Sequence, residues 1–219
     1  MTTKAKARGM SLVSTSSVGT TVSANAISGT DILLSYNTMP GNQPSSYSNT
    51  AFIWQASDAI PYNQAPLSSQ AVPTNTQNGS MDFSGLQVQS KAYIIGYAVG
   101  SNVANICSWV SIPPGTGTNT TYQTSVWTTP DGVLPDVVLV HYDTPVGNQP
   151  QTNSQWIGIW QGAAPSYTTP PLAQVPVGNN NATGQVGLPV TLLRGTTYSL
   201  AYFMGQKQTT MASSYVFST

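Results

Sequence analysis

The feature that most constrains this chain is a block of sequence that occurs twice. Residues 36–55 read YNTMPGNQPSSYSNTAFIWQ, and residues 142–161 read YDTPVGNQPQTNSQWIGIWQ. The blocks align without a gap at a spacing of 106 residues, and 10 of the 20 positions are identical. A second match, YIIGYAVG at 93–100 with YSLAYFMG at 198–205, follows in the same order. The sequence therefore indicates an internal duplication of a module of roughly 100 residues.

Two copies at this period predict two tandem domains, because solenoid repeats are shorter and need at least about three units to bury a core. The length of 219 residues allows two domains of this size, each with its own core. We place the first domain at residues 1–112, with a flexible basic N-terminus, and the second at residues 122–219. The segment 113–121, PPGTGTNTT, is the predicted linker, because Pro and Gly interrupt strands and nothing apolar is available for burial.

Runs rich in Val, Thr, Tyr and Ile alternate with clusters of Gly, Pro and Asn throughout the chain. This pattern predicts an all-β fold, since no window has a helical period and turn residues recur between the runs. Short strands at this spacing favour two antiparallel sheets packed as a sandwich in each domain. We expect strands at residues 20–24, 31–36, 51–55, 79–83, 92–99, 105–112, 123–128, 136–143, 156–161, 184–186, 197–204 and 211–218. Within residues 93–99 the odd-numbered Tyr, Ile and Val side chains share a face, which we expect to point inward.

Three segments of the second copy carry a resemblance to a known kind of domain: WIGIW at 156–160, RGTTYSLAY at 194–202 and ASSYVF at 212–217. They are similar to the strand patterns of immunoglobulin-like (Ig-like) domains of the SKICH type and of fibronectin-like modules beside metallophosphatases. The resemblance spans about residues 142–219. It implies tandem Ig-like antiparallel β-sandwich domains, with no catalytic residue in the matched segments. The first copy departs from the pattern, with TAFIW at 50–54 and CSWVS at 107–111.

Charged residues make up only 5% of the chain, all six acids are Asp, and the formal net charge is zero. Three of the six cations, Lys4, Lys6 and Arg8, lie in the first eight residues, so no basic stripe remains for a nucleic acid. This N-terminal cluster is either a solvated terminus or a small anchor for an anionic surface. A polar, uncharged surface suits self-association, which little repulsion opposes. It suits sugar recognition equally, because amides and hydroxyls pair with sugar hydroxyls.

No segment of the sequence is typical of a membrane span or of a Sec-type signal. We therefore expect a protein that is cytoplasmic or exported by a non-Sec route. Cys107 is the only cysteine, so the chain forms no intramolecular disulfide. Its setting, ICSWVS, predicts a small buried hydrophobic residue rather than a nucleophile.

The sequence offers no set of catalytic residues, and we predict a protein that is not an enzyme and has no cofactor. His141 is the only histidine, and Ser35 occupies the aligned position in the first copy. His141 and Asp143 would share one side of a strand, as in acyl transfer, but no G-x-S-x-G accompanies them. Only Asp31 and Asp136 keep a carboxylate in both copies, and each precedes an apolar strand, where a turn-forming role is typical. A calcium site made of backbone carbonyls and one or two Asp stays open.

The repeated Gly-Asn-Gln-Pro loop, with the tryptophan that follows it, is the candidate site. A structural role explains three of the four loop residues: Gly for positive φ, Asn for a local hydrogen bond and Pro for the exit. A functional role makes the loop amides and the tryptophans a neutral ligand site at the tip of each domain, where Ig-like folds present binding loops. The candidate ligand-binding residues are Asn42, Gln43, Trp54, Asn148, Gln149 and Trp160.

The tryptophans have two alternative placements. Trp156 and Trp160 share one face of their predicted strand, while Ile157 and Ile159 take the other. If the isoleucine face packs inward, the two tryptophans form an exposed stacking platform beside the loop. Otherwise they belong to the core.

We therefore expect a non-enzymatic, lectin-like binder of neutral glycans or host-surface ligands, with one site per domain. The alternative is a self-assembling structural protein of the inclusion or surface-layer type, which forms homo-oligomers. Neither function involves nucleic acid or a membrane span.

Overall fold

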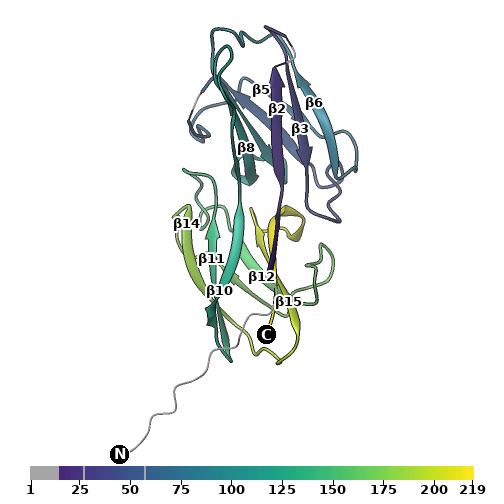
Figure 1. Cartoon of the computed structure of the whole chain (residues 1–219), viewed down its shortest axis with the longest axis vertical. Coiled ribbons are helices and arrows are strands. Elements are labelled where there is room, and N and C mark those ends of the chain that lie inside the picture. The colour runs from purple at the N-terminus through teal and green to yellow at the C-terminus, as the bar shows by residue number, and fades with distance from the viewer. Residues whose placement is uncertain (1–14, 27, 57) are drawn as a thin grey trace, which may run out of the picture.

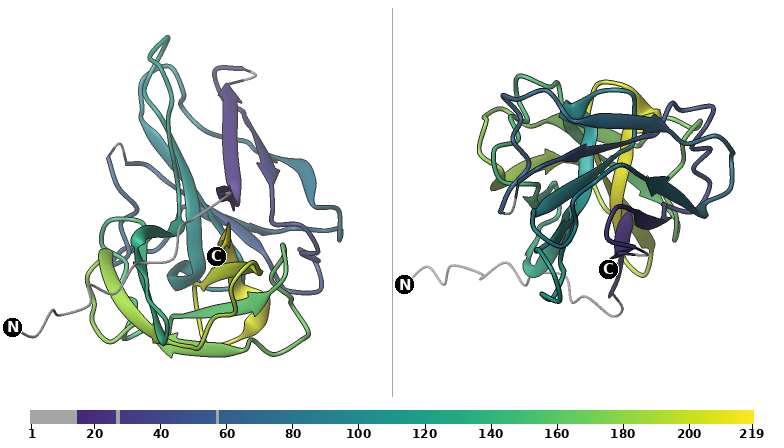
Figure 2. Two further views of the ribbon diagram at one scale, coloured as in Figure 1. Left: turned by 60° about the horizontal axis from the view of Figure 1, so that its bottom comes forward. Right: turned by 90° about the horizontal axis from the view of Figure 1, so that it is seen from above.

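The computed structural model describes residues 15–26, 28–56 and 58–219, so the basic cluster Lys4, Lys6 and Arg8 lies outside the described residues. This part of the chain forms sixteen strands and two short 3-10 helices, which confirms the all-β prediction. The strands make four antiparallel sheets, an arrangement compatible with a β-sandwich. Two lobes follow one another along the long axis of the molecule (Figure 1), and they overlap when viewed along that axis (Figure 2).

The first lobe, the upper one in Figure 1, contains one three-stranded and one five-stranded sheet. The three-stranded sheet has the order β2-β3-β6, formed by β2 Thr21–Ala26, β3 Ile32–Asn37 and β6 Asn78–Phe83. The five-stranded sheet has the order β5-β4-β7-β8-β9, formed by β5 Ser68–Ala71, β4 Thr50–Trp54, β7 Tyr93–Ala98, β8 Ile106–Ile112 and β9 Thr120–Gln123. The 3-10 helix η1, Val103–Asn105, precedes β8.

The second lobe repeats this strand order. Its three-stranded sheet has the order β10-β11-β14, formed by β10 Ser125–Val133, β11 Val137–Asp143 and β14 Thr183–Pro189. Its five-stranded sheet has the order β13-β12-β15-β16-β1, formed by β13 Ala173–Pro176, β12 Trp156–Gln161, β15 Thr197–Phe203, β16 Met211–Ser218 and β1 Thr15–Gly19. The 3-10 helix η2, Gln208–Thr210, takes the place of η1.

The two repeats exchange their first strands. β1 precedes the first lobe in the sequence but pairs with β16 of the second lobe, whereas β9 opens the second repeat but pairs with β8 of the first lobe. The chain passes between the lobes at Thr20, between β1 and β2, and at Thr124, between β9 and β10. The two crossing segments run beside each other, since β1 contacts β10 and β2 contacts β9 (Figure 1).

This exchange moves short segments relative to the predicted boundaries. Residues 15–19, which we predict in the first domain, belong to a sheet of the second lobe. Residues 120–123, which we divide between the linker and the second domain, belong to a sheet of the first lobe. The sequence pattern identifies strands, but it does not say which of two similar sheet edges a strand joins.

A hydrophobic core fills each lobe and continues from one lobe into the other. Tyr93, Ile95, Tyr97 and Val99 all belong to this core, which confirms the inward face predicted for this segment. The Tyr97 ring stacks on Tyr36 of the opposite sheet at a centroid distance of 5.3 Å.

The core tyrosines explain two glycines at equivalent positions. Tyr142 and Tyr202 pair in the second lobe as Tyr36 and Tyr97 do in the first, with ring centroids 5.6 Å apart. A Cβ atom at Gly79 would lie 2.5 Å from the hydroxyl oxygen of Tyr36, and one at Gly184 would lie 2.6 Å from that of Tyr142. A side chain at either glycine would therefore displace a core tyrosine.

The outer face of each five-stranded sheet is buried as well. In the first lobe, Phe52 and Trp54 pack with Ile60 from the segment between β4 and β5. In the second lobe, Trp160 packs with Phe203 and with Met39, which comes from the first lobe. The second of these clusters therefore joins the two lobes.

Candidate functional site

The repeated Gly-Asn-Gln-Pro loops follow β3 and β11 and are held by the same internal hydrogen bonds. The side-chain amide of Asn42 donates to Asn49 Oδ1 at 2.8 Å, and that of Asn148 donates to Gln155 Oε1 at 2.9 Å. Asn42 and Asn148 are buried, whereas Gln43 and Gln149 are exposed. The predicted amide pair of each loop is thus divided: the asparagine stabilises the loop and only the glutamine is accessible.

The two loops lie at the boundary between the lobes rather than at a free tip. Gly41 and Gly147 have φ of 84° and 87°, a conformation that favours glycine. A Cβ atom at Gly41 would lie 3.5 Å from the Tyr167 ring, and one at Gly147 would lie 3.2 Å from the Tyr62 ring. Each loop therefore rests against a tyrosine of the other repeat, and the repeated glycine serves both the turn and this close approach.

Of the two placements predicted for the tryptophans, the exposed platform is wrong. Ile157 and Ile159 do pack into the core, which places Trp160 on the outer face of the sheet. That face is covered, and Trp54 and Trp160 are only 2% and 5% exposed. Their indole N–H groups donate to main-chain carbonyls of the covering segments, Trp54 to Gln64 at 3.1 Å and Trp160 to Thr169 at 2.9 Å. Neither ring offers a face to a ligand.

Trp156 is half-buried and stacks face to face on Phe203, with ring centroids 3.8 Å apart and planes at 5°. Gly158 makes room for this arrangement, because a Cβ there would lie 2.8 Å from the Trp160 ring and 2.9 Å from the Trp156 ring. The rings of Trp156, Trp160 and Phe203 thus pack together on the outer face of the sheet.

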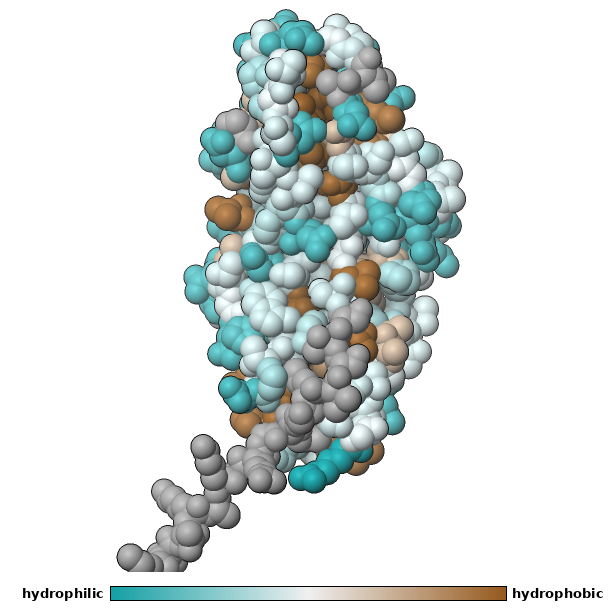
Figure 3. All heavy atoms as spheres, in the orientation of Figure 1, coloured by the Kyte–Doolittle hydropathy of each residue, from teal (hydrophilic) through white to brown (hydrophobic). Residues whose placement is uncertain are grey.

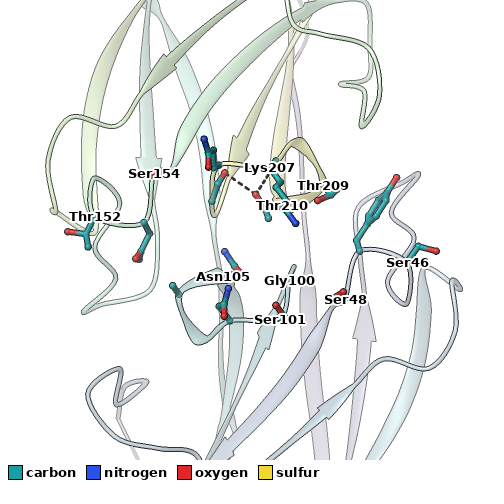
Figure 4. A pocket seen from close by; sticks show the side chains of 16 residues that line it. Ser46, Ser48, Gly100, Ser101, Asn105, Thr152, Ser154, Lys207, Thr209 and Thr210 are labelled. Atoms are coloured by element: carbon teal, nitrogen blue, oxygen red, sulfur yellow. Dashed lines mark hydrogen bonds between the residues drawn. The ribbon is translucent and has the colours of Figure 1, made fainter.

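A polar cleft of about 550 Å³ lies between the lobes, where equivalent segments of the two repeats face each other. In Figure 4, Ser101 and Asn105 of the first lobe lie opposite Lys207, Thr209 and Thr210 of the second. The loops after β3 and β11 close its two ends. The lining residues fall into equivalent pairs: Ser46 with Thr152, Tyr47 with Asn153, Ser48 with Ser154, Gly100 with Gly205, Ser101 with Gln206, Asn102 with Lys207, Ala104 with Thr209 and Asn105 with Thr210.

One polar contact fixes the floor of the cleft. The Asn105 side-chain amide donates to the main-chain carbonyl of Met204 across the lobe boundary, at 2.8 Å. At the equivalent position, the Thr210 hydroxyl lies 2.7 Å from the Lys207 carbonyl and 3.1 Å from the Gly205 carbonyl. Asn105 and Thr210 are therefore engaged within the protein.

Other lining groups remain available to a ligand. The side chains of Ser101, Asn102, Gln206 and Lys207 are exposed and make no hydrogen bond with the part of the chain that the structure describes. They supply a hydroxyl and an amide on the first-lobe wall, and an amide and an ammonium group on the second-lobe wall. The half-buried ring of Tyr47, tilted against Tyr167 at 5.4 Å, adds an aromatic surface at one end.

The backbone at both ends of the cleft is unusual. Ser48 and Ser154 have φ of 58° and 52°, and they are the only non-glycine residues with positive φ within the described ranges. This conformation is uncommon for a residue with a side chain and concentrates at ligand sites and switch regions. Both serines have this conformation, so the two repeats share the same local backbone conformation at the two ends of the cleft.

The cleft is almost free of charge. Lys207 is the one charged residue that lines it, and no carboxylate does. Burial raises the pKa of the neighbouring Tyr167 hydroxyl, which keeps this group neutral. The site can therefore donate and accept hydrogen bonds through groups that are neutral apart from the Lys207 ammonium.

His141 and Asp143 each interact with other side chains. His141 stacks on Trp127 at 5.3 Å, and its Nε2 lies 3.3 Å from the side-chain nitrogen of Gln185. Asp143 accepts a hydrogen bond from the Tyr122 hydroxyl at 2.9 Å. Within the described ranges, no three His, Cys, Asp or Glu residues gather where they could hold a metal ion.

Cys107 and Asp31 have structural settings. Cys107 is fully buried, as predicted, and burial raises the pKa of its thiol to about 12. Asp31 accepts hydrogen bonds from the hydroxyls of Ser28 and Thr30, which lower its pKa. No helix in the described part of the chain is long and apolar enough to cross a membrane.

Sequence reasoning missed the cleft, although signals for it exist. Ser48 and Ser154 are one of the ten identical pairs in the repeated block, and Gly100 and Gly205 end the second matched segment. An identical serine in a loop that has otherwise diverged indicates a constrained position, and this is the signal in the sequence that points to the cleft.

No model of a known protein family matches the chain, and a search of curated proteins finds no significant relative.

Proposed function

We propose that this protein is a non-enzymatic binding protein that holds a neutral glycan in the cleft between its two lobes. The observation that carries the proposal is the symmetric polar lining of a cleft of about 550 Å³, with exposed hydroxyl and amide groups on both walls. A volume of this order suits a small-molecule site. The proposal replaces the two tip sites of the sequence analysis with one site that both repeats build.

The chemistry of the lining supports a sugar over other small ligands. Neutral donors and acceptors on facing walls pair with several hydroxyls of one ligand, while an aromatic ring such as Tyr47 suits the apolar face of a sugar. Asn102 and Lys207 occupy equivalent positions but differ in charge, so a ligand would bind in one orientation despite the symmetry of the backbone.

A glycan array probed with the intact chain tests this function. We expect binding to neutral saccharides, weakened about 2- to 10-fold in each of the variants Asn102→Ala and Gln206→Ala, as expected for the loss of one hydrogen bond. Asn78→Ala is the matched control, because Asn78 is also an exposed amide but lies on β6, outside the cleft. If the folded chain binds no neutral saccharide, the proposal is wrong.

A self-assembling structural protein is the second candidate, and the exchange of β1 and β9 between lobes favours it. Exchange of an identical element is a low-cost route to association between copies. On the face in Figure 3, hydrophilic and intermediate residues predominate, with hydrophobic residues scattered among them. The formal net charge of zero adds little repulsion between copies. Light scattering across a concentration series near neutral pH should reveal large species, and a monomer at every concentration would contradict this candidate.

We also infer that the lobes are Ig-like modules related by duplication. The common strand order and the matched hydrogen bonds of the two repeated loops support this origin. An experimental structure should superpose residues 21–123 on residues 125–218 together with β1. A different strand order in the two lobes would contradict the inference.

A further inference from the structure

The two crossing points, Thr20 and Thr124, are equivalent in topology. Each is 1% exposed, and each donates its main-chain N–H to an equivalent carbonyl: Thr20 to Ala212 at 2.9 Å and Thr124 to Cys107 at 2.8 Å. Thr20 joins β1, which pairs in the second lobe, to β2 of the first lobe. Thr124 joins β9, which pairs in the first lobe, to β10 of the second lobe. Differences between the two crossings therefore come from side chains.

The side chain holds only one of these crossings in place. The Thr124 hydroxyl donates to the Cys107 carbonyl at 2.8 Å. The buried Thr20 hydroxyl has no carbonyl partner and lies beside the Cys107 thiol, a weak hydrogen-bonding group. A buried hydroxyl without a good hydrogen-bond partner destabilises the state in which β1 pairs with β16 of its own chain. Release of β1 would expose this hydroxyl to water.

The exchanged strands differ in the same way as the crossings, because β9 has more side-chain contacts than the described part of β1. On β9, Tyr122 stacks on Trp109 of β8 with ring centroids 5.7 Å apart and planes at 13°, and its hydroxyl reaches Asp143 in the second lobe. Val18 holds the equivalent position on β1, pairs with Ser214 and is 41% exposed.

For residues 17–19, the part of β1 whose side chains the structure describes, no side-chain hydrogen bond or ring contact joins β16. For these three residues, the attachment to β16 therefore rests on main-chain pairing, which is independent of sequence.

From these differences we propose that β1 is a transferable strand, and that its second acceptor is another copy of this chain. β1 of one molecule would leave its own β16 by rotation about Thr20 and pair with β16 of the second molecule, whose β1 makes the reciprocal move. The acceptor edge is identical in every copy, so each main-chain hydrogen bond is remade between chains.

This proposal names the contact by which copies would associate if the protein is self-assembling, the second candidate function: β1 of one copy on β16 of another. It is independent of the glycan site. It predicts a closed pair of molecules in which two strands are exchanged while β9 stays in place. Assemblies without exchange of β1 would leave the second candidate standing and overturn only the present proposal.

The test uses two variants of the full chain, each in a Cys107→Ala background, so that every disulfide involves an introduced cysteine. One carries Val18→Cys and the other Ser214→Cys, at positions that are Cα partners across β1 and β16. The two proteins are mixed at high concentration, incubated with mild warming and oxidised. We expect a disulfide-linked heterodimer, identified by mass spectrometry, whose yield rises with concentration.

Three controls make the outcome decisive. A single chain with both Val18→Cys and Ser214→Cys must form the bond within itself, which shows that the pairing geometry permits it. Val18→Cys mixed with Ser80→Cys, an exposed position on β6, gives the background of random contact. Thr20→Val, which removes the poorly partnered hydroxyl, should lower the heterodimer yield. A yield no higher than that background, while the double variant closes, would overturn the proposal.

Discussion

The side-chain amide of Asn105 reaches across the lobe boundary and donates to the carbonyl of Met204 at 2.8 Å. Gly100 and Gly205 leave space for it, since a Cβ at Gly100 would lie 2.7 Å from Asn105 Oδ1 and one at Gly205 would lie 2.8 Å from its Nδ2. Two equivalent glycines thus frame one asparagine that has a threonine, Thr210, as its counterpart.

Asn105→Ala should destabilise the chain by about 1–3 kcal/mol, because the Met204 carbonyl loses the shorter of its two side-chain hydrogen bonds and keeps only the one from Gln155 Nε2 at 3.5 Å. For a chain of this length, this corresponds to a fall in Tm of roughly 2–12 °C. Differential scanning calorimetry measures it, with the exposed Asn63→Ala as the matched control. Equal Tm values for the two variants would show that the hydrogen bond from Asn105 to Met204 does not contribute to the stability of the folded chain.

Trp160→Ala should reduce stability rather than ligand binding alone. The side chain is 5% exposed and packs with Phe203, and aromatic-to-alanine changes in a packed interior cost about 3–5 kcal/mol. Chemical denaturation followed by circular dichroism measures the loss, and Leu172→Ala, at a residue that is 58% exposed, is the control. A variant as stable as the control would return Trp160 to the list of ligand-binding candidates.

Stability should fall when the pH rises above 10. Burial raises the pKa of Tyr97 and Tyr202 above the ordinary value of 10.0, so both hydroxyls stay neutral in the folded chain. Below pH 10 this contribution to stability is complete, and it is lost progressively as the pH rises, because only the unfolded chain ionises these groups readily. Tm measured from about pH 8 to about pH 11, with tyrosinate absorbance recorded in parallel, should show ionisation and unfolding together. Ionisation without a fall in Tm would contradict this prediction.

Cleavage between Pro113 and Asn119 should not release two independent fragments. Each lobe keeps a strand from the other repeat, β1 in the second and β9 in the first, and the core continues between them. The nicked protein should elute as one species in native size-exclusion chromatography and separate only in denaturant. Separation under native conditions would show that the exchanged strands add little to cohesion.

Much of the fold follows from the sequence because it depends on local pattern. Every predicted strand overlaps an observed one, and the inward face of residues 93–99 follows from period-two alternation. The missed strands are β1, β5, β9 and β13, which all lie at sheet edges. These strands have four or five residues, and β5, for example, consists of Ser68–Ala71. The edge strands of the three-stranded sheets, such as β2 and β6, are predicted because they contain buried apolar residues. The described residues of β1, β5, β9 and β13 include no buried side chain, so nothing in the composition of these strands separates them from loops.

The site was harder to predict, because its residues meet only through the contact between lobes. Pattern correctly placed Trp160 opposite the isoleucines of its strand, but exposure depended on the segment between β12 and β13, which covers that face. Asn42 illustrates the same limit: its conservation between the repeats reflects a hydrogen bond to Asn49 inside the loop. Repetition within a chain identifies a constrained residue without saying what constrains it.

The exchange of β1 also determines how the molecule would respond to mechanical load. β1 and β16, the first and last strands in the described part of the chain, are antiparallel neighbours, and Thr15 pairs with Phe217. A force that pulls the two chain ends apart would therefore act on a single ladder and peel it from the open end, one residue pair at a time. Hairpin-like unzipping of this kind yields at low force, so a tether attached at both ends would detach β1 while the fourteen strands between β1 and β16 bear almost no tension.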